Sequence, residues 1–242
     1  MLDFVSRLRT TTVRLFADSA DLDDIIRVSR DPDIAGVTTN PTLMRAAGVE
    51  DYETFARAVL AALPDKPVSF EVLADDLAGM EREARTILGW GGNVFVKIPV
   101  TTTQGLSTLP LIARLSAEGH AVNVTAVMTI QQVSRVAAAI SPGAPAIISI
   151  FAGRIADTGR DPEPLMRAAV ASVGHLPDVE ILWASPRELL NVFHADRCGC
   201  HIITATPALI DKLGLIGKDL DEYSRETVRM FHTDSRAAGY RL

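Results

Sequence analysis

Residues 94–99 read VFVKIP, a run in which a single lysine, Lys97, interrupts apolar and β-branched side chains. Continuously apolar runs of this kind are typical of strands covered on both faces, as in parallel sheets. Seven similar runs occur along the chain: VRLFAD at 13–18, IAGVTT at 34–39, VSFEV at 68–72, AVNVTA at 121–126, AIISIF at 146–151, VEILWAS at 179–185 and HIITAT at 201–206. The eight runs predict eight strands of one parallel sheet.

Amphipathic stretches separate these runs, and several of them follow a residue that commonly caps a helix. The clearest are DDIIRVSR at 23–30, DYETFARAVLAAL at 51–63, LAGMEREARTILGW at 77–90, LSTLPLIARLSAEG at 106–119 and TIQQVSRVAAAI at 129–140. Asp21, Asp51 and Thr129 are the expected N-caps. Eight strand–helix units in about 240 residues predict an α/β fold, a closed (β/α)8 TIM barrel, because an open doubly wound sheet usually needs fewer strands.

The domain organisation follows from the absence of any linker. No low-complexity or Pro/Gly/Ser-rich stretch divides the chain, so we expect a single barrel domain over residues 1–242. The segment GKDLDEYSRETVRMFHTDSRAAGYRL at 217–242 lies beyond the eighth unit and predicts an extra amphipathic helix, an extension of about 218–242. It would either cap the barrel or cross to a neighbouring subunit.

Composition excludes several classes of function. The chain is 48% hydrophobic with a mean hydropathy of +0.18, enough for a large core. A net charge of −6 and a pI of about 5.4 disfavour nucleic acid and anionic membranes as partners. No apolar run is long enough to span a bilayer, and residues 1–12 lack the apolar centre of a signal peptide, so we expect a cytoplasmic protein.

The two cysteines, Cys198 and Cys200, lie close to His194 and His201 and raise the question of a metal site. Both cysteines stand at the start of an apolar, strand-like run, where free cysteine is commonly a small buried side chain. We therefore expect no metal at this position.

Polar residues gather where the predicted strands end, and in a barrel the carboxyl ends of the strands carry the chemistry. They are Asp18, Thr38, Thr39, Asn40, Glu71, Lys97, Asn123, Thr125, Ser149, Arg154, Ser185 and Arg187. Each also has an ordinary interpretation. Asp18 would cap the helix near Asp21, the TTNPT stretch would form a turn, Glu71 would pair with an arginine, Lys97 would reach solvent, and the arginines would pair with Asp157 or Glu188. Only the shared rim links them.

An inward-facing Lys97 predicts Schiff-base chemistry. Burial disfavours the charged ammonium and favours a neutral amine, which attacks a ketone carbonyl. Glu71 on the adjacent strand is placed to carry protons, through a water held by Thr125, and Asp18 to act as acid or base on a substrate hydroxyl. Arg154 and Arg187, after the sixth and seventh strands, would grip a phosphate in the region where many barrels bind one.

At this point the sequence resembles the transaldolase family, including the short members grouped with fructose-6-phosphate aldolase. The matching motifs, in the family order from Phe16 to about Leu213, are FADSADLDDI, GVTTNPTL, SFEV, VFVKIPVT, NVTAVMT, SIFAGRIADTG and WASPRELLNVFHADRCGCHIITATPALIDKL. The resemblance covers most of the chain.

The resemblance implies a role for each rim residue. Lys97 would form the Schiff base, Asp18 and Glu71 would be the acid–base carboxylates, and Thr125 would help to hold the catalytic water. The substrate-binding set would be Asn40 and Asn123 for the ketose hydroxyls, Thr38 and Ser149 in the pocket wall, and Arg154, Arg187 and Ser185 for the phosphate. The family uses sugar phosphates and neither metal nor organic cofactor, and its small members are often homo-oligomers.

Two positions bear on the type of reaction. The family's free aldolases have glutamine at the position of Glu71 and tyrosine at that of Phe151, whereas transaldolases proper resemble this chain. A phenyl ring neither donates a proton nor holds a hydrolytic water, so the three-carbon enamine should wait for an aldehyde acceptor. The departures are Ile150, where the family usually has proline, and Pro186, which is expected to bias Ser185 towards an extended backbone.

The leading hypothesis is transfer of a dihydroxyacetone unit from a ketose phosphate, such as sedoheptulose 7-phosphate or fructose 6-phosphate, to an aldose phosphate, as in the pentose phosphate pathway. Three alternatives remain. The first is a lyase that releases free dihydroxyacetone, and the second is an enzyme that makes a longer-chain ketose phosphate for secondary metabolism. The third is a sugar-phosphate-binding barrel that has lost catalysis.

Overall fold

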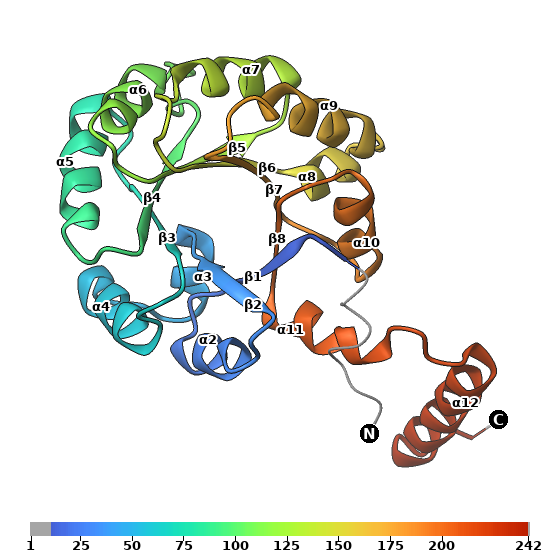
Figure 1. Ribbon diagram of the computed structural model, residues 1–242. Coiled ribbons are helices and arrows are strands. Elements are labelled where there is room, and N and C mark those ends of the chain that lie inside the picture. The colour runs from blue at the N-terminus through green and yellow to red at the C-terminus, as the bar shows by residue number, and fades with distance from the viewer. Residues whose placement is uncertain (1–10, 242) are drawn as a thin grey trace.

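A computed structural model describes residues 11–241 of the chain and shows a closed barrel of eight parallel strands with helices on its outside (Figure 1). Each strand pairs with the next in chain order, and β8 closes on β1. The strands are β1 Arg14–Asp18, β2 Ile34–Thr38, β3 Val68–Glu71, β4 Val94–Pro99, β5 Val122–Val127, β6 Ala146–Ile150, β7 Val179–Trp183 and β8 Ile202–Ala205. The predicted TIM barrel is confirmed. The prediction that residues 1–12 lack the apolar centre of a signal peptide falls mainly on residues 1–10, which lie outside the described residues.

The helices lie between the strands as the amphipathic stretches predict. They are α2 Leu22–Ser29, α3 Pro41–Ala46, α4 Tyr52–Ala62, α5 Leu77–Leu88, α6 Leu109–Ala117, α7 Ile130–Ala139, α8 Ala152–Asp157, α9 Glu163–Val173, α10 Leu190–Arg197, α11 Pro207–Ile210 with the 3-10 turn η1 Asp211–Leu215, and α12 Leu220–Ala237. The three expected N-caps are confirmed. Asp21 accepts from the amide of Asp24 at 2.9 Å, Asp51 caps α4, and Thr129 forms a capping box with Gln132.

The barrel interior has its own small apolar core, separate from the larger core between strands and helices. Its buried members are Phe16, Ile147, Leu182, Ala184 and Ile202. Because side chains alternate along a strand, the residue two positions after an inward apolar one also faces inward. Asp18 follows Phe16 and Ser149 follows Ile147 in this way, so polar groups occupy the carboxyl end of the barrel above an apolar plug.

Gly36 on β2 makes room for this plug. A Cβ atom at Gly36 would lie 2.6 Å from the ring of Phe16, a contact that no side chain tolerates. Phe16 itself is 1% exposed and fills the barrel axis beneath the polar rim. Only glycine at position 36 therefore lets the aromatic ring close the interior.

The extra C-terminal helix is confirmed as α12, which Figure 1 shows standing away from the barrel wall. None of its residues is buried, and large apolar side chains are exposed along it: Leu220, Tyr223, Val228, Met230 and Phe231. In the described part of the chain, no helix combines the length and apolar character that crossing a membrane requires.

Candidate active site

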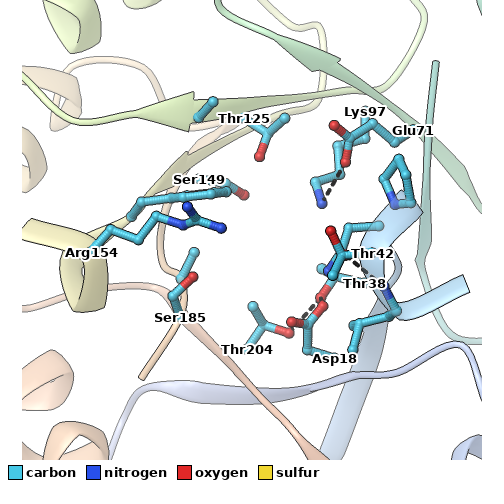
Figure 2. Close-up of a pocket in the computed structure, with 16 residues that line it drawn as sticks. Asp18, Thr38, Thr42, Glu71, Lys97, Thr125, Ser149, Arg154, Ser185 and Thr204 are labelled. Atoms are coloured by element: carbon cyan, nitrogen blue, oxygen red, sulfur yellow. Dashed lines mark hydrogen bonds and ion pairs between the residues drawn. The ribbon is translucent and has the colours of Figure 1, made fainter. Parts of the chain in front are cut away.

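A cavity of about 420 Å³ opens at the carboxyl end of the barrel, and all eight strands or the loops after them contribute to its wall (Figure 2). The residues that line it are Asp18, Thr38, Asn40, Pro41, Thr42, Leu43, Glu71, Lys97, Thr125, Ala126, Ser149, Phe151, Arg154, Ala184, Ser185 and Thr204. The structure thus brings together every rim residue expected from the sequence, and Phe151, except Thr39, Asn123 and Arg187. Figure 2 shows Lys97 and Glu71 on one side of the cavity, with Arg154 and Ser185 across from them.

Lys97 faces into the barrel and forms an ion pair with Glu71. The two residues are register partners on the adjacent strands β4 and β3, which places their side chains at the same height. The Nζ atom of Lys97 lies 3.0 Å from Oε2 of Glu71 and donates a hydrogen bond of 2.8 Å to the carbonyl oxygen of Thr39. Lys97 is only 5% exposed, so it does not reach out to bulk solvent. An amine and a proton acceptor therefore stand in contact inside the cavity.

Asp18 lies at the end of β1 and belongs to a chain of hydroxyl groups. Its Oδ1 accepts a 2.8 Å hydrogen bond from Oγ1 of Thr38, which lies 2.6 Å from Oγ1 of Thr204. Burial raises the pKa of Asp18 above its ordinary value, against the opposing attraction of Lys97 and the bond from Thr38. Asp21, not Asp18, caps α2. A carboxyl group with a raised pKa is suited to both giving and taking a proton.

Thr204 is a site residue that the sequence reasoning missed, although its position carried a signal. It follows the inward-facing Ile202 by two positions on β8, so strand alternation alone predicts that it points into the barrel. Thr42 and Ala126 were also missed. Thr42 lies in the first turn of α3, where no strand period applies, and Ala126 lies on β5 where the register with β6 shifts and interrupts the alternation.

Thr125 presents a hydroxyl group that has no partner among the described residues. Its Oγ1 atom is buried and makes no hydrogen bond within residues 11–241, although Thr125 lines the cavity (Figure 2). Buried hydroxyls are nearly always hydrogen-bonded, so an unpaired one beside a cavity marks a place for a water or a substrate hydroxyl. Asn40 differs, because its Oδ1 already accepts from the amide of Leu43 at 3.0 Å as the N-cap of α3.

Asn123 supports the cavity wall without lining the cavity. It is fully buried on β5, donates a 3.0 Å hydrogen bond from Nδ2 to Oγ of Ser69 and accepts one of 2.7 Å from Oγ of Ser149. These contacts use a donor and an acceptor of the amide that the resemblance assigns to a ketose hydroxyl. In the described structure, the Asn123 side chain links Ser69 on β3 to Ser149 on β6 by hydrogen bonds.

The two arginines differ in position. Arg154 on α8 lines the cavity, and its guanidinium lies 5.4 Å from the centroid of the Phe151 ring. Arg187, in the loop after β7, does not line the cavity. Its Nε donates to Oδ1 of Asp157 at 3.0 Å and its Nη2 contacts Oδ2 of the same carboxylate. The structure thus realises the pairing of Arg187 with Asp157 that the sequence left open as the ordinary alternative.

Two cavity residues carry a strained backbone. Within residues 11–241, only Ala126 and Ser185 are non-glycine residues with positive φ, at 60° and 59°. The expectation that Pro186 keeps Ser185 extended is wrong. The reason is a close approach: a Cβ atom at Gly153 would lie 1.6 Å from the carbonyl oxygen of Ser185, so the loop is pressed against α8. Such strain costs about 1–3 kcal/mol per residue and concentrates at functional sites.

The cysteines lie away from this cavity. Cys198 and Cys200 are buried free thiols between α10 and β8, and burial raises the pKa of both, that of Cys200 to about 12. Among residues 11–241, no three histidine, cysteine or acidic side chains group as a metal site would require.

Comparison with known proteins gives a consistent result. The model of the family described as Transaldolase/Fructose-6-phosphate aldolase matches residues 15–241. The chain is 36% identical over 193 residues to a probable transaldolase of Dehalococcoides mccartyi, covering 79% of this chain and 86% of the relative. It is 32% identical over 231 residues to a probable transaldolase of a Thermoanaerobacter species, covering 95% and 100%.

A similarity to solved structures extends to the fold alone. The dihydrodipicolinate synthase of Thermotoga maritima superposes with a TM-score of 0.58 at 13% identity, covering 96% of this chain and 85% of that one. The family is decided by the sequence matches, which run through the strands that carry Lys97, Glu71 and Asp18. By these matches, the chain belongs to the transaldolase/fructose-6-phosphate aldolase family of enzymes.

Proposed function

We propose that the protein transfers a dihydroxyacetone unit from a ketose phosphate, such as sedoheptulose 7-phosphate or fructose 6-phosphate, to an aldose phosphate through a Schiff base on Lys97. The observation that carries this proposal is the contact between Lys97 and Glu71, 3.0 Å apart inside a cavity that also holds Asp18 and Arg154. An amine, two carboxylates and a cation are the groups that this reaction needs.

Imine formation uses the Lys97–Glu71 pair. Glu71 takes a proton from the Nζ atom, and the amine attacks the C2 carbonyl of the ketose to form a carbinolamine. Glu71 then returns the proton to the carbinolamine hydroxyl, which leaves as water. The unpaired hydroxyl of Thr125 offers this water a hydrogen bond inside the cavity.

Carbon–carbon cleavage uses Asp18. Its carboxylate takes the proton of the C4 hydroxyl, the C3–C4 bond breaks, and the electron pair moves to the protonated imine to give a neutral enamine. An aldose phosphate leaves. The raised pKa of Asp18 makes it a better base than an exposed aspartate and allows it to return the proton when the enamine attacks the acceptor aldehyde. Hydrolysis of the product imine restores Lys97.

The phosphate of the substrate is bound across the cavity from Lys97. Arg154 and Ser185 line that side of the cavity. The Ser185 hydroxyl makes no hydrogen bond to another described residue, so it is free to donate one to the phosphate. We propose Arg187 as a second phosphate ligand, recruited from its pair with Asp157.

A transferase is favoured over a lyase by two side chains in the wall. Phe151 offers no hydroxyl to protonate the enamine, and Glu71 stands where free aldolases of this family have glutamine. The enamine then persists until an aldehyde arrives. The lyase remains the second candidate, and production of a longer-chain ketose phosphate is a variant of the first that differs only in acceptor.

Two measurements test this function. Borohydride reduction in the presence of fructose 6-phosphate should attach a dihydroxyacetone-derived mass to the Lys97 peptide. A coupled assay should detect free dihydroxyacetone only in trace amounts, with turnover appearing when an aldose phosphate is added. Release of dihydroxyacetone at the same rate without acceptor would establish the lyase, and tight sugar phosphate binding without any adduct would establish a non-catalytic barrel.

The setting of the enzyme is part of the proposal. We place it in the cytoplasm and in the pentose phosphate pathway, acting on sugar phosphates without metal or organic cofactor, as a single domain. The exposed apolar side chains of α12 favour a homo-oligomer in which that helix contacts a second copy. Light scattering of the intact chain and of a chain ending at residue 217 would test the last point.

A further inference from the structure

We propose that Asp157 sets the affinity of the site for the phosphate of its substrates, by withholding Arg187 from the cavity until a phosphate displaces it. This inference rests on the proposed function, because it concerns the phosphate-binding side of the same cavity. Asp157 does not line the cavity, but its ion pair with Arg187 decides whether that arginine is available to a phosphate.

The backbone around the pair is fixed. Gly153 lets the loop after β7 lie directly on α8, since its missing Cβ leaves room for the carbonyl oxygen of Ser185. The amide of Arg187 donates a 2.7 Å hydrogen bond to Oδ1 of Asn191 at the start of α10. The main chain around Arg187 is thus held on both sides. Only its side chain can move between the Asp157 carboxylate and a phosphate in the cavity.

The side chain of Arg187 forms an ion pair with Asp157. The carboxylate holds the guanidinium through two atoms, Nε and Nη2, a bidentate arrangement that a phosphate would use equally well. Arg187 and Asp157 are each about half exposed, at 49% and 51%. Exposed pairs of this kind contribute little net stability, so an incoming phosphate dianion can take the guanidinium from the carboxylate.

The position of Asp157 makes it a competitor for the phosphate site. It stands three residues after Arg154 on α8, which places the two side chains on the same face of the helix. A phosphate held by Arg154 therefore meets the carboxylate of Asp157 as a nearby like charge. Removing that charge frees Arg187 and ends the repulsion, and both effects strengthen phosphate binding.

The test uses inorganic phosphate as the probe, with its dissociation constant measured by calorimetry in the intact protein. Asp157→Asn should tighten phosphate binding about two- to fivefold, the range that corresponds to the loss of an exposed ion pair. Michaelis constants for phosphorylated donors should fall by a similar factor. Michaelis constants for a donor that carries no phosphate, such as fructose, should stay unchanged.

Glu188→Gln is the matched control, because it removes a charge next to Arg187 from a residue for which no ion pair is seen in the described structure. It should change the phosphate constant by less than Asp157→Asn does. In an Arg187→Gln background, Asp157→Asn should no longer tighten binding by the full factor, because the arginine that it releases is gone.

Three results would overturn the inference: weaker phosphate binding in Asp157→Asn, an effect equal to that of Glu188→Gln, or undiminished tightening without Arg187. The first would mean that Asp157 orients Arg187 for phosphate. Because phosphate binding is measured without turnover, a protein that fails to form the Lys97 adduct but responds to Asp157→Asn as expected would sink the proposed reaction and leave the withholding role standing.

Discussion

Replacing Lys97 by methionine should separate the chemical role of the amine from its structural role. Methionine has a similar length and no charge, so it fills the same space on β4 without a cavity. The change removes the proposed nucleophile, and turnover should fall at least about 10⁴-fold, the scale on which the loss of a covalent nucleophile acts. The same change leaves the carboxylate of Glu71 without its partner.

The structural cost follows from the 3.0 Å separation of the two charged groups. At an effective dielectric constant of about 20, two unit charges at that distance attract by roughly 5 kcal/mol before desolvation is subtracted. Breaking a fully buried pair costs about 3–5 kcal/mol. Glu71 and Lys97 border an open cavity, so water partly replaces the lost partner and we expect a cost of about 2 kcal/mol. In a chain of this size that lowers Tm by roughly 4–8 °C.

The double variant Lys97→Met with Glu71→Gln provides the internal check. It removes both charges, so it should recover most of the lost stability while remaining inactive. Calorimetry measures the melting temperatures, and borohydride trapping followed by peptide mapping reports the adduct. The chain has four lysines, at 66, 97, 212 and 218, and Lys212→Met at an exposed position is the control. Retained trapping or turnover in Lys97→Met, or a double variant no more stable than the single one, would refute this reasoning.

Three further predictions concern the cavity wall. Because burial raises the pKa of Asp18, the folded protein holds that proton more tightly than the unfolded chain, and this stabilisation is lost as pH rises through the folded pKa. Asp18→Asn should therefore match the wild-type Tm in acid and exceed it at neutral pH in a pH series of melting curves, and no difference between the two pH values would contradict it. Thr125→Val removes an unpaired buried hydroxyl, so Tm should rise by about 2–4 °C while kcat falls at least tenfold in the coupled assay; a lower Tm would show that the hydroxyl has a partner. Gly153→Ala places a Cβ on the carbonyl of Ser185. The folded protein should lose about 3 kcal/mol or more of stability, and the KM for phosphorylated donors should rise. An unchanged Tm would mean that the loop is free to move.

The fold could be predicted because the strands are continuously apolar and evenly spaced. Strands of a parallel barrel are covered on both faces, so they read as nearly continuous apolar runs. The capping residues Asp21, Asp51 and Thr129 indicated where three of the helices begin. The positions of Lys97 and Glu71 at the cavity could also be predicted, since both lie two residues after inward-facing positions near the ends of adjacent strands.

The remaining details depend on contacts between residues far apart in sequence. Arg187 and Asp157 are 30 positions apart, and nothing local to either decides that the guanidinium turns to the carboxylate and not to the cavity. Asn123 has the right residue type and strand, but its hydrogen bonds to Ser69 and Ser149 keep it below the surface. The positive φ of Ser185 overrides the local influence of Pro186, because the loop packs on Gly153.

The apolar plug has a consequence for the kinetic order of the proposed reaction. Phe16, Leu182 and Ile202 fill the axis below the polar rim, so among the described residues the barrel interior offers the cavity no passage towards the other end. In the proposed reaction, donor, released aldose and acceptor therefore all use the carboxyl end of the barrel. The released aldose and the acceptor would also share the phosphate-binding side of the cavity, so the first product is expected to depart before the second substrate enters, while the three-carbon unit stays attached to Lys97. The expected result is double-displacement kinetics, with parallel lines in double-reciprocal plots at several acceptor concentrations.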